Sequence, residues 1–350
     1  MSVLYKNFTK CLIKNNASIK DAMKKMNDIG KGDKIIKNYQ FLLLVDKTNK
    51  LIGTITDGDI RRSILRGESL NSSVIKATNM NPIYGLEKEY ENNNALLNSI
   101  LHETFFLPIL NKNMQVIDAL VSDSSYLNKN ISVLLMAGGF GKRLGNLTKN
   151  TPKPLIKKNG KAIIDNVLDI INKCNLVTKL YISTHYLSSL LKEHVNSRIF
   201  KFPIKYLYED TPLGTAGSLS LLDNKLKENN ILVINADLIT NIDLNNLIDY
   251  HNISKNDATI AVAEYTYKIP YGVIEYSSSG SFLELIEKPD INKFVAAGIY
   301  VLSPKFKSLL SLEEVIDMPD LINRGRKNNL AIGVFPIYEE WSDIGSPEDL

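Results

Sequence analysis

The sequence has little of what several classes of protein require. Its 350 residues include two cysteines, Cys11 and Cys174, and four histidines, none in the spacing of a metal site. We therefore expect reduced thiols and not a disulfide scaffold. No stretch approaches the ~18 apolar residues of a membrane span, and the first residues lack the apolar core of a secretory signal. A cytoplasmic protein without membrane contact is expected.

Neither sign of charge dominates the chain. It has 42 Lys and Arg residues against 38 Asp and Glu residues, a net charge of +4. This balance does not predict binding to nucleic acid. The chain is 44% hydrophobic and 23% charged, which is typical of globular proteins, and its length predicts about two domains.

The first half of the chain predicts two related units. A helix over 18–26 is expected, because Ser18 can cap it and Asp21 follows three residues later. The runs FLLLVD (41–46) and LIGTIT (51–56) predict buried strands. A weaker copy of the pattern follows, with a helix over 95–102 and strands over 105–110 and 116–121. This is an internal repeat of a β-α-β-type unit, and the polar segment 122–130 after it predicts a linker.

The second half alternates predicted strands and helices. Strands are expected over 131–137, 179–184, 231–236 and 258–262, and helices over 161–173 and 187–194. Such alternation indicates a mostly parallel sheet with helices on both faces. Ligands then gather at the carboxyl ends of the strands.

A glycine-rich stretch, LLMAGGFGKRLGNLTKNTPKP, occupies 134–154 directly after the first of these strands. It indicates a phosphate-binding loop, because only glycine lets backbone N–H groups approach a phosphate so closely. A Walker A loop would have Ser or Thr where Arg143 stands, and a dinucleotide fingerprint would have a third glycine where Leu144 stands. The stretch therefore predicts a phosphate loop of another kind, with a dense group of cations: Lys142, Arg143 and Lys153.

The segment LLLVDKTNKLIGTITDGDIRR resembles the CBS family, and residues 1–127 resemble a tandem pair of CBS modules. The resemblance implies a regulatory domain in which Thr56 and Asp59 bind the ribose of a regulatory nucleotide. The second module reads IDALVSD and lacks this pattern. The alternative is that Asp59 only caps the helix that follows.

Residues 131–350 resemble the sugar nucleotidyltransferases, in the sugar-1-phosphate guanylyltransferase-like branch. The motifs that carry the resemblance are AGGFGKRL, TPKPL, EDTPLGTAG, NAD, YGVI, EKP, AAGIY and WSDIG. The resemblance implies a Rossmann-like α/β/α nucleotidyltransferase fold with a mixed, mostly parallel sheet, preceded by the CBS repeat. It also implies condensation of a nucleoside triphosphate with a sugar 1-phosphate, releasing pyrophosphate.

The residue types suit this chemistry. The attacking sugar phosphate is largely ionised at neutral pH, since its second pKa is about 6, so no general base is needed. The site must instead position the reactants and neutralise negative charge. Arg143 is expected to hold the leaving pyrophosphate and Lys153 the α-phosphate. Nucleotide contacts are assigned to Ala137, Gly138, Gly139, Gly141, Lys142, Glu209 and Gly214.

The family resemblance assigns the other ligands. Mg²⁺ is expected on Asp237 and Asp343, although Asp237 could instead cap a helix. The sugar phosphate is expected at Thr215, Gly272, Glu287 and Lys288.

The carboxylate of Glu209 favours guanine as the base of the nucleotide. A carboxylate offers two acceptors to the adjacent N1–H and N2 amino donors of guanine, whereas the pyrimidine-using relatives carry Gln at this place. The alternative is that Glu209 is a solvated surface carboxylate beside Asp210.

The identity of the sugar stays open. Where the family often has Asn before AGIY, this chain has Ala296. CBS modules fused ahead of such a transferase resemble the glucosamine-1-phosphate guanylyltransferases of bacterial legionaminic acid synthesis. The alternatives are mannose 1-phosphate, heptose 1-phosphate, a UTP- or dTTP-dependent enzyme, and a non-catalytic nucleotide sensor. GTP, a sugar 1-phosphate and a homo-oligomer are the expected partners.

Overall fold

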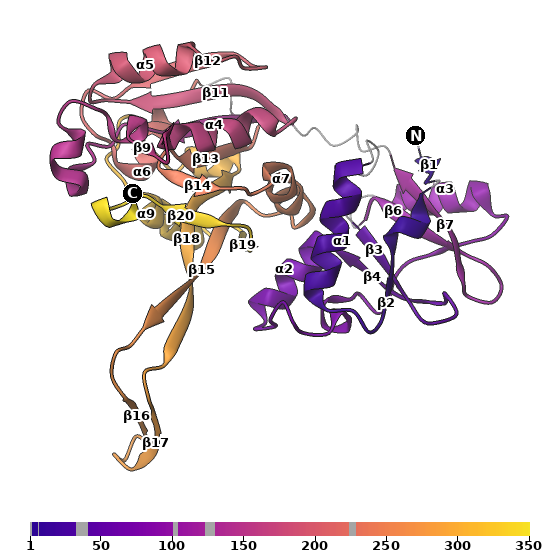
Figure 1. The fold of residues 1–350 in the computed structure, drawn as a ribbon. Coiled ribbons are helices and arrows are strands. Elements are labelled where there is room, and N and C mark those ends of the chain that lie inside the picture. The colour runs from indigo at the N-terminus through magenta and orange to yellow at the C-terminus, as the bar shows by residue number, and fades with distance from the viewer. Residues whose placement is uncertain (1, 6, 33–40, 101–103, 123–129, 224–228) are drawn as a thin grey trace. The chain divides into compact units, whose positions relative to one another are not determined.

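The chain divides into two compact units, Met1–Lys129 and Asn130–Leu350. The structure, a computed structural model, describes residues 2–5, 7–32, 41–100, 104–122, 130–223 and 229–350 (Figure 1). The predicted linker falls almost wholly outside the described residues. Within them, no helix is both long and apolar enough to cross a membrane.

The first unit begins with a three-stranded sheet. Strands β2 (Leu12–Lys14) and β3 (Phe41–Val45) are parallel, and β4 (Leu51–Thr56) is antiparallel to β3. Helix α1 (Ile19–Gly32) connects β2 to β3, and α2 (Asp57–Leu65) follows β4. The helix and both strands predicted for this segment are therefore present, with α1 longer than expected.

The same pairing pattern recurs in a second sheet. Strands β5 (Gly85–Leu86) and β6 (Phe106–Leu110) are parallel, β7 (Val116–Ser122) is antiparallel to β6, and α3 (Tyr90–Ser99) connects β5 to β6. Strand β1 (Ser2–Leu4) adds to the outer edge of β7. The internal repeat predicted from sequence is thus present in the structure.

Two local interactions explain this unit. Ser18 and Asp21 form the predicted capping box of α1: the Ser18 N–H donates to Asp21 Oδ2 at 2.9 Å and the Asp21 N–H to Ser18 Oγ at 3.1 Å. Phe41 and Phe106, the first residues of β3 and β6, are buried and stack with ring centroids 4.0 Å apart. Equivalent positions of the two repeats therefore meet in one core.

The second unit is built on a seven-stranded sheet of order β12-β11-β8-β13-β18-β15-β19. Strand β18 runs antiparallel to both of its neighbours, and the other pairings are parallel, which confirms the predicted mixed, mostly parallel sheet. The bounds are β8 Ile131–Met136, β11 Val177–Thr184, β12 Ile204–Tyr208, β13 Ile231–Asn235, β15 Ala258–Lys268, β18 Asp290–Leu302 and β19 Ile332–Ile337.

Helices cover both faces of this sheet. Successive side chains of a strand point to opposite faces, and in the buried strands apolar side chains point to both. Along β8, Val133 and Leu135 belong to the core under α4, α5 and α7, whereas Leu134 belongs to the core under α6, α8 and α9. The helices are α4 Ile163–Lys173, α5 Ser188–Asn196, α6 Gly214–Gly217, α7 Leu244–Ile253, α8 Pro304–Lys307 and α9 Met318–Lys327. The α/β/α arrangement expected from sequence is therefore present.

Short elements frame the ends of the strands. Strand β14 (Leu238–Thr240) pairs antiparallel with β20 (Trp341–Asp343). Strand β10 (Lys161–Ala162) pairs with β9 (Lys157–Lys158), so α4 begins two residues later than predicted. The 3₁₀ helices are η1 Phe8–Cys11, η2 Val74–Ala77, η4 Lys142–Thr148, η5 Lys153–Leu155, η6 Ser218–Leu221 and η8 Pro347–Asp349.

A two-stranded arm, residues 264–294, leaves the sheet (Figure 1). Strands β15 and β18 run on together beyond their buried halves, and β16 (Val273–Tyr276) and β17 (Phe282–Ile286) form the tip. The predicted strand 258–262 was too short, because its apolar run marks only the part of β15 that lies in the core.

Candidate active site

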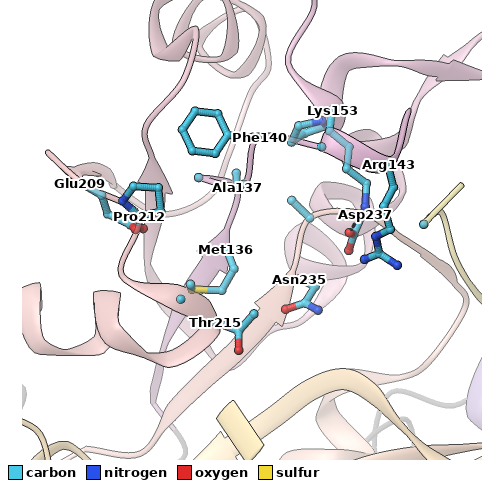
Figure 2. Close-up of a pocket in the computed structure, with 17 residues that line it drawn as sticks. Met136, Ala137, Phe140, Arg143, Lys153, Glu209, Pro212, Thr215, Asn235 and Asp237 are labelled. Atoms are coloured by element: carbon cyan, nitrogen blue, oxygen red, sulfur yellow. Dashed lines mark hydrogen bonds and ion pairs between the residues drawn. The ribbon is translucent and has the colours of Figure 1, made fainter. Parts of the chain in front are cut away.

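A cavity of about 400 Å³ lies at the carboxyl ends of β8 and β13, where a parallel sheet is expected to gather ligands. Its volume falls in the range of roughly 300–1,000 Å³ that is usual for small-molecule sites. Figure 2 shows Glu209 and Pro212 at one end and Arg143, Lys153 and Asp237 at the other. Ten predicted site residues line it: Ala137, Gly138, Gly139, Gly141, Arg143, Lys153, Glu209, Gly214, Thr215 and Asp237.

The glycine loop after β8 leaves bare backbone along the cavity. A Cβ added at Gly139 would meet nothing within 4 Å, so that position is open. Gly141 has a φ of +65°, and a Cβ there would lie 2.8 Å from Thr148 Cγ2 and 2.9 Å from Lys153 Cβ. Glycine is therefore required at 141 both for its backbone conformation and for the approach of Lys153.

Lys153 and Asp237 form an ion pair at the cationic end. Lys153 Nζ lies 2.5 Å from Asp237 Oδ2, and the two side chains are 12% and 23% exposed. Lys153 begins η5 directly after Pro152, and Asp237 follows β13 by two residues. Arg143 lies beside them and also close to Gly345. A Cβ added at Gly345 would lie 3.3 Å from Arg143 Nη1.

Asp343 is brought behind Asp237 by the pairing of β14 with β20. In that register Asp343 lies opposite Leu238, and the Ile344 N–H donates to the Asp237 carbonyl at 3.0 Å. Burial, followed by the negative charge of Asp237, raises the pKa of Asp343 above its usual value, while Lys153 and Arg143 oppose the shift. Asp343 does not line the cavity itself.

The two carboxylates fit a magnesium ion. Asp237 Oδ1 is buried and has no hydrogen-bond partner, an arrangement that is costly unless another group satisfies it. Mg²⁺ takes one or two carboxylates and fills its remaining positions with water and phosphate oxygens. Among the described residues, no group of three or more His, Cys, Asp or Glu side chains could hold a metal, so substrate and water would have to complete this one.

Glu209 forms the opposite end of the cavity. Its side chain is buried, so the alternative of a solvated surface carboxylate is wrong. Oε1 accepts a hydrogen bond from the Ser183 hydroxyl, and Oε2 accepts one from the Leu213 N–H at 2.8 Å. The backbone of Glu209 is fixed between Thr184 and His185. Since a carboxylate has about four lone-pair sites, two acceptor positions remain.

Gly214 and Thr215 join the cavity to the start of α9. Gly214 has a φ of +79°, and a Cβ there would lie 2.6 Å from the Ile316 carbonyl oxygen. The Thr215 hydroxyl donates to Asp317 Oδ1 at 3.1 Å and accepts from the Met318 N–H at 2.8 Å. Its proton is therefore engaged in holding α9 and is not directed at a ligand.

The other residues predicted to bind the sugar phosphate are not brought to the cavity. Gly272, Glu287 and Lys288 lie together on the arm, where a Cβ on Gly272 would be 3.1 Å from Glu287 Oε2. Lys288 has a left-handed φ of 46°, and its N–H donates to the Tyr271 carbonyl at 3.2 Å. None of the three lines the cavity, because the arm leads away from the sheet (Figure 1).

Sequence reasoning missed several lining residues, among them Phe140, Pro212 and Asn235 (Figure 2). Each stands inside one of the motifs AGGFG, EDTPLG and NAD, beside a glycine or a charged residue whose role is easier to recognise from sequence. Asn235 also contacts Gly298, where a Cβ would lie 2.8 Å from its Nδ2 atom. Lys142 lies in η4, and its side chain is outside the described part of the structure.

Thr56 and Asp59, the residues expected to bind a regulatory nucleotide, form the capping box of α2. The Thr56 hydroxyl lies 2.6 Å from Asp59 Oδ2, and the Asp59 N–H donates to it at 3.2 Å. Arg62 Nη2 lies 2.7 Å from Asp59 Oδ1. The N-cap is thus Thr56, not Asp59 as the alternative interpretation had it, and nucleotide binding here stays a prediction.

The chain belongs to the nucleotidyl transferase family. The profile of that family matches residues 132–350, which include the whole cavity, and the CBS domain profile matches residues 12–66. Membership is consistent with the seven-stranded α/β/α unit and with a phosphate loop that is neither of the Walker A nor of the dinucleotide type.

Several curated relatives are guanylyltransferases by name. The chain is 31% identical over 229 residues to a "Probable mannose-1-phosphate guanylyltransferase 1" of Oryza sativa subsp. japonica, and 29% identical over 230 residues to a "Mannose-1-phosphate guanylyltransferase catalytic subunit beta" of Dictyostelium discoideum. Each match covers 63% of this chain and 62% of the relative. Among solved structures, HddC from Yersinia pseudotuberculosis is 21% identical over 62% of this chain and 95% of that chain, with a TM-score of 0.49.

Replacing Gly141 tests the packing of the loop against Lys153. We expect Gly141→Ala to weaken GTP binding tenfold or more, because the added Cβ strains the backbone and displaces Lys153, measured by titration calorimetry. Gly160→Ala is the matched control, since Gly160 has a φ of +79° but nothing within 4 Å of its Cβ position. Equal losses for both variants would show that the contact with Lys153 is unimportant.

Proposed function

We propose that this chain is a GTP-dependent sugar-1-phosphate nucleotidyltransferase. The observation that carries the proposal is the polarity of the cavity: Lys153, Arg143 and Asp237 lie at one end and the buried carboxylate of Glu209 at the other. A cavity of about 400 Å³ suits a nucleotide whose phosphates and base have opposite requirements. The names of the relatives support the same activity, although the chain spans only 62% of their length.

The reaction transfers a nucleoside monophosphate. An oxygen of the sugar phosphate attacks the α-phosphorus in line; the new P–O bond forms as the bond to the β-phosphate breaks, and pyrophosphate leaves. Because the nucleophile is already an anion at neutral pH, no side chain has to remove a proton. The arrangement therefore needs cations and bare backbone donors in place of a His or Ser dyad.

The residues of the cavity have distinct roles in this proposal. The backbone of Gly138, Gly139 and Gly141 holds the triphosphate, and Arg143 binds the leaving pyrophosphate with its planar fork. Lys153 binds the α-phosphate, where charge accumulates, and exchanges part of its contact with Asp237 for the substrate. Asp237 and Asp343 would hold Mg²⁺, which neutralises phosphate charge when bound.

Glu209 is proposed to read guanine. Its carboxylate is fixed by Ser183 and Leu213 and keeps two acceptor positions for the N1–H and N2 amino donors of the base. Uracil and thymine would set a carbonyl against one carboxylate oxygen, which leaves a buried polar group unpaired and costs about 1–3 kcal/mol. Adenine lacks N1–H and is refused for the same reason.

For the sugar we retain glucosamine 1-phosphate, on the strength of the fusion to a CBS domain. Mannose 1-phosphate is the second candidate, favoured by the names of the relatives. The structure adds that Ala296, where the family often has Asn, is exposed at the root of the arm.

Two substitutions test the metal. Asp237→Asn and Asp343→Asn should each lower turnover at limiting Mg²⁺ about a hundredfold, the loss of roughly 3 kcal/mol seen when one charge-stabilising group is removed from such a site. Asp320→Asn, an exposed aspartate on α9, is the control and should leave turnover unchanged. Near-normal turnover of either site variant would contradict the assignment.

A substrate matrix tests the activity and the base. Pyrophosphate release is measured for GTP, UTP, dTTP, CTP and ATP, each with glucosamine, mannose and heptose 1-phosphates. GTP with glucosamine 1-phosphate is expected to be fastest, and Glu209→Gln should lower the preference for GTP over UTP at least tenfold, because the charge-assisted pair with guanine is lost. Asp210→Asn, the exposed neighbour, should keep the preference. A wild type that prefers UTP or dTTP would refute the role of Glu209.

The first unit is proposed to be a regulatory domain that binds an adenosine or guanosine nucleotide through Thr56 and Asp59. Calorimetry of the full chain with AMP, which the proposed base site refuses, should give a signal that Asp59→Ala abolishes. Asp21→Ala is the control, because it removes the equivalent capping box of α1 at a similar cost of about 1 kcal/mol. A signal that survives in Asp59→Ala, or none in the wild type with either AMP or GMP, would contradict the prediction.

A further inference from the structure

The arm begins at the edge of the cavity and leads away from it. Strand β18 lies beside β13, and their register ends at Ile234 opposite Ile299, so the part of β18 before that point extends beyond the cavity end of β13. The root is fixed there, since Trp341 Nε1 donates to the Ala297 carbonyl at 3.0 Å. Past the root, β15 and β18 pair without interruption as far as Lys268 opposite Asp290.

The arm exposes large apolar side chains that a lone protomer leaves in water. More than half of the surface of each of these residues is exposed: Tyr267, Tyr271, Ile274, Tyr276, Phe282 and Leu285. Single exposed apolar residues are ordinary, but a contiguous group of this kind marks a surface that binds something.

One face of the tip is apolar. Ile274 pairs with Leu285 and Tyr276 with Phe282 on that face, whereas the other face carries Glu275 opposite Glu284 beside Val273 and Ile286. A two-stranded ribbon is marginally stable by itself, and both of its edges are unpaired strands. Two arms that pack by the apolar face about a two-fold axis would each cover the other with the same surface and leave the glutamates in water.

Two residues of the arm, Glu287 and Lys288, are expected from sequence to bind the sugar phosphate. Glu287 and Lys288 lie between β17 and β18, and neither lines the cavity of its own chain. The arm spans residues 264–294, enough for the roughly 20–30 residues a side that a stable interface of ~1,600 Å² uses. A second copy of this chain is thus an occupant of the right size.

We infer that two copies of this chain exchange their arms, so that Glu287 and Lys288 of one protomer complete the sugar-phosphate end of the cavity of its partner. The role of the cavity rests on the proposed function. The exchange itself rests on the exposed apolar face of the arm and on the continuous course of the arm away from its own cavity.

Mixed dimers test the sharing of the site. One full-length chain carries Asp237→Asn, and the other carries Glu287→Gln with Lys288→Ala. Each is given a different affinity tag, and the dimers that hold both tags are purified. Each parent should be at least a hundredfold less active than the wild type. The mixed dimer should regain about half of the wild-type activity per dimer, because one of its two sites has neither change.

A mixed dimer as inactive as its parents would show that the arm serves its own protomer and would overturn the exchange. An active parent with Glu287→Gln and Lys288→Ala would overturn it as well. The control pairs Asp237→Asn with Arg143→Ala. Both changes lie outside the arm, so each site of this mixed dimer carries one of them. The pair therefore regains no activity, whether the arms are exchanged or not.

Association of the full chain gives a readout that does not depend on activity. Ile274→Asn with Leu285→Asn should raise the dissociation constant of the dimer at least tenfold, measured by sedimentation velocity. Ile199→Asn is the control, because Ile199 is 91% exposed but lies outside the arm. A wild type that is monomeric at micromolar concentration, or equal dissociation of the arm variant and the control, would overturn the exchange. Inactivity of the wild type with every substrate, beside arm-dependent association, would defeat the proposed function alone.

Discussion

The ion pair between Lys153 and Asp237 is the interaction on which the cavity depends. It joins the loop after Pro152 to the end of β13, and Asp237 in turn holds the Ile344 backbone and so the strand that carries Asp343. The side chains of Lys153 and Asp237 are 12% and 23% exposed, and neither charge would be tolerated there without the other, because a largely buried charge without a partner is costly. The bare backbone of Gly141 is what allows Lys153 to come so close.

Strand β18 joins the sheet to the arm. It is the antiparallel strand between β13 and β15, and it brings the chain back from the arm into the sheet. The register of this strand pair shifts between Ile260 and Val262, near the point where the pair leaves the core for the arm. Gly298, with a φ of +73° and in contact with Asn235, lies at the same point. One strand pair thus contacts Asn235, a lining residue of the cavity, and continues as the exposed arm.

The first unit shows how one pair of side chains can have both a structural and a functional interpretation. Thr56 and Asp59 form the same capping box around α2 that Ser18 and Asp21 form around α1. A nucleotide at Thr56 and Asp59 would have to share oxygens that already hold the helix. The comparison of Asp59→Ala with Asp21→Ala therefore separates binding from capping, because both changes remove a cap.

The sequence by itself determined the features that rest on local chemistry. Runs of apolar residues predicted strands such as 51–56, the Ser18–Asp21 spacing predicted a helix start, and the glycines and cations of 134–154 predicted a phosphate loop. These succeed because strand burial, helix capping and positive φ are set by a few neighbouring residues. The family profile confirms the nucleotidyl transferase interpretation of the motifs. Tertiary structure alone decided which motif residues meet, because a motif names a residue but not where its element leads. It brought Glu209, Lys153 and Asp237 to one cavity, added Asn235 and Phe140, and carried Glu287 and Lys288 away on the arm. That outcome depends on the antiparallel register of β15 and β18, a pairing between distant segments that no local pattern specifies.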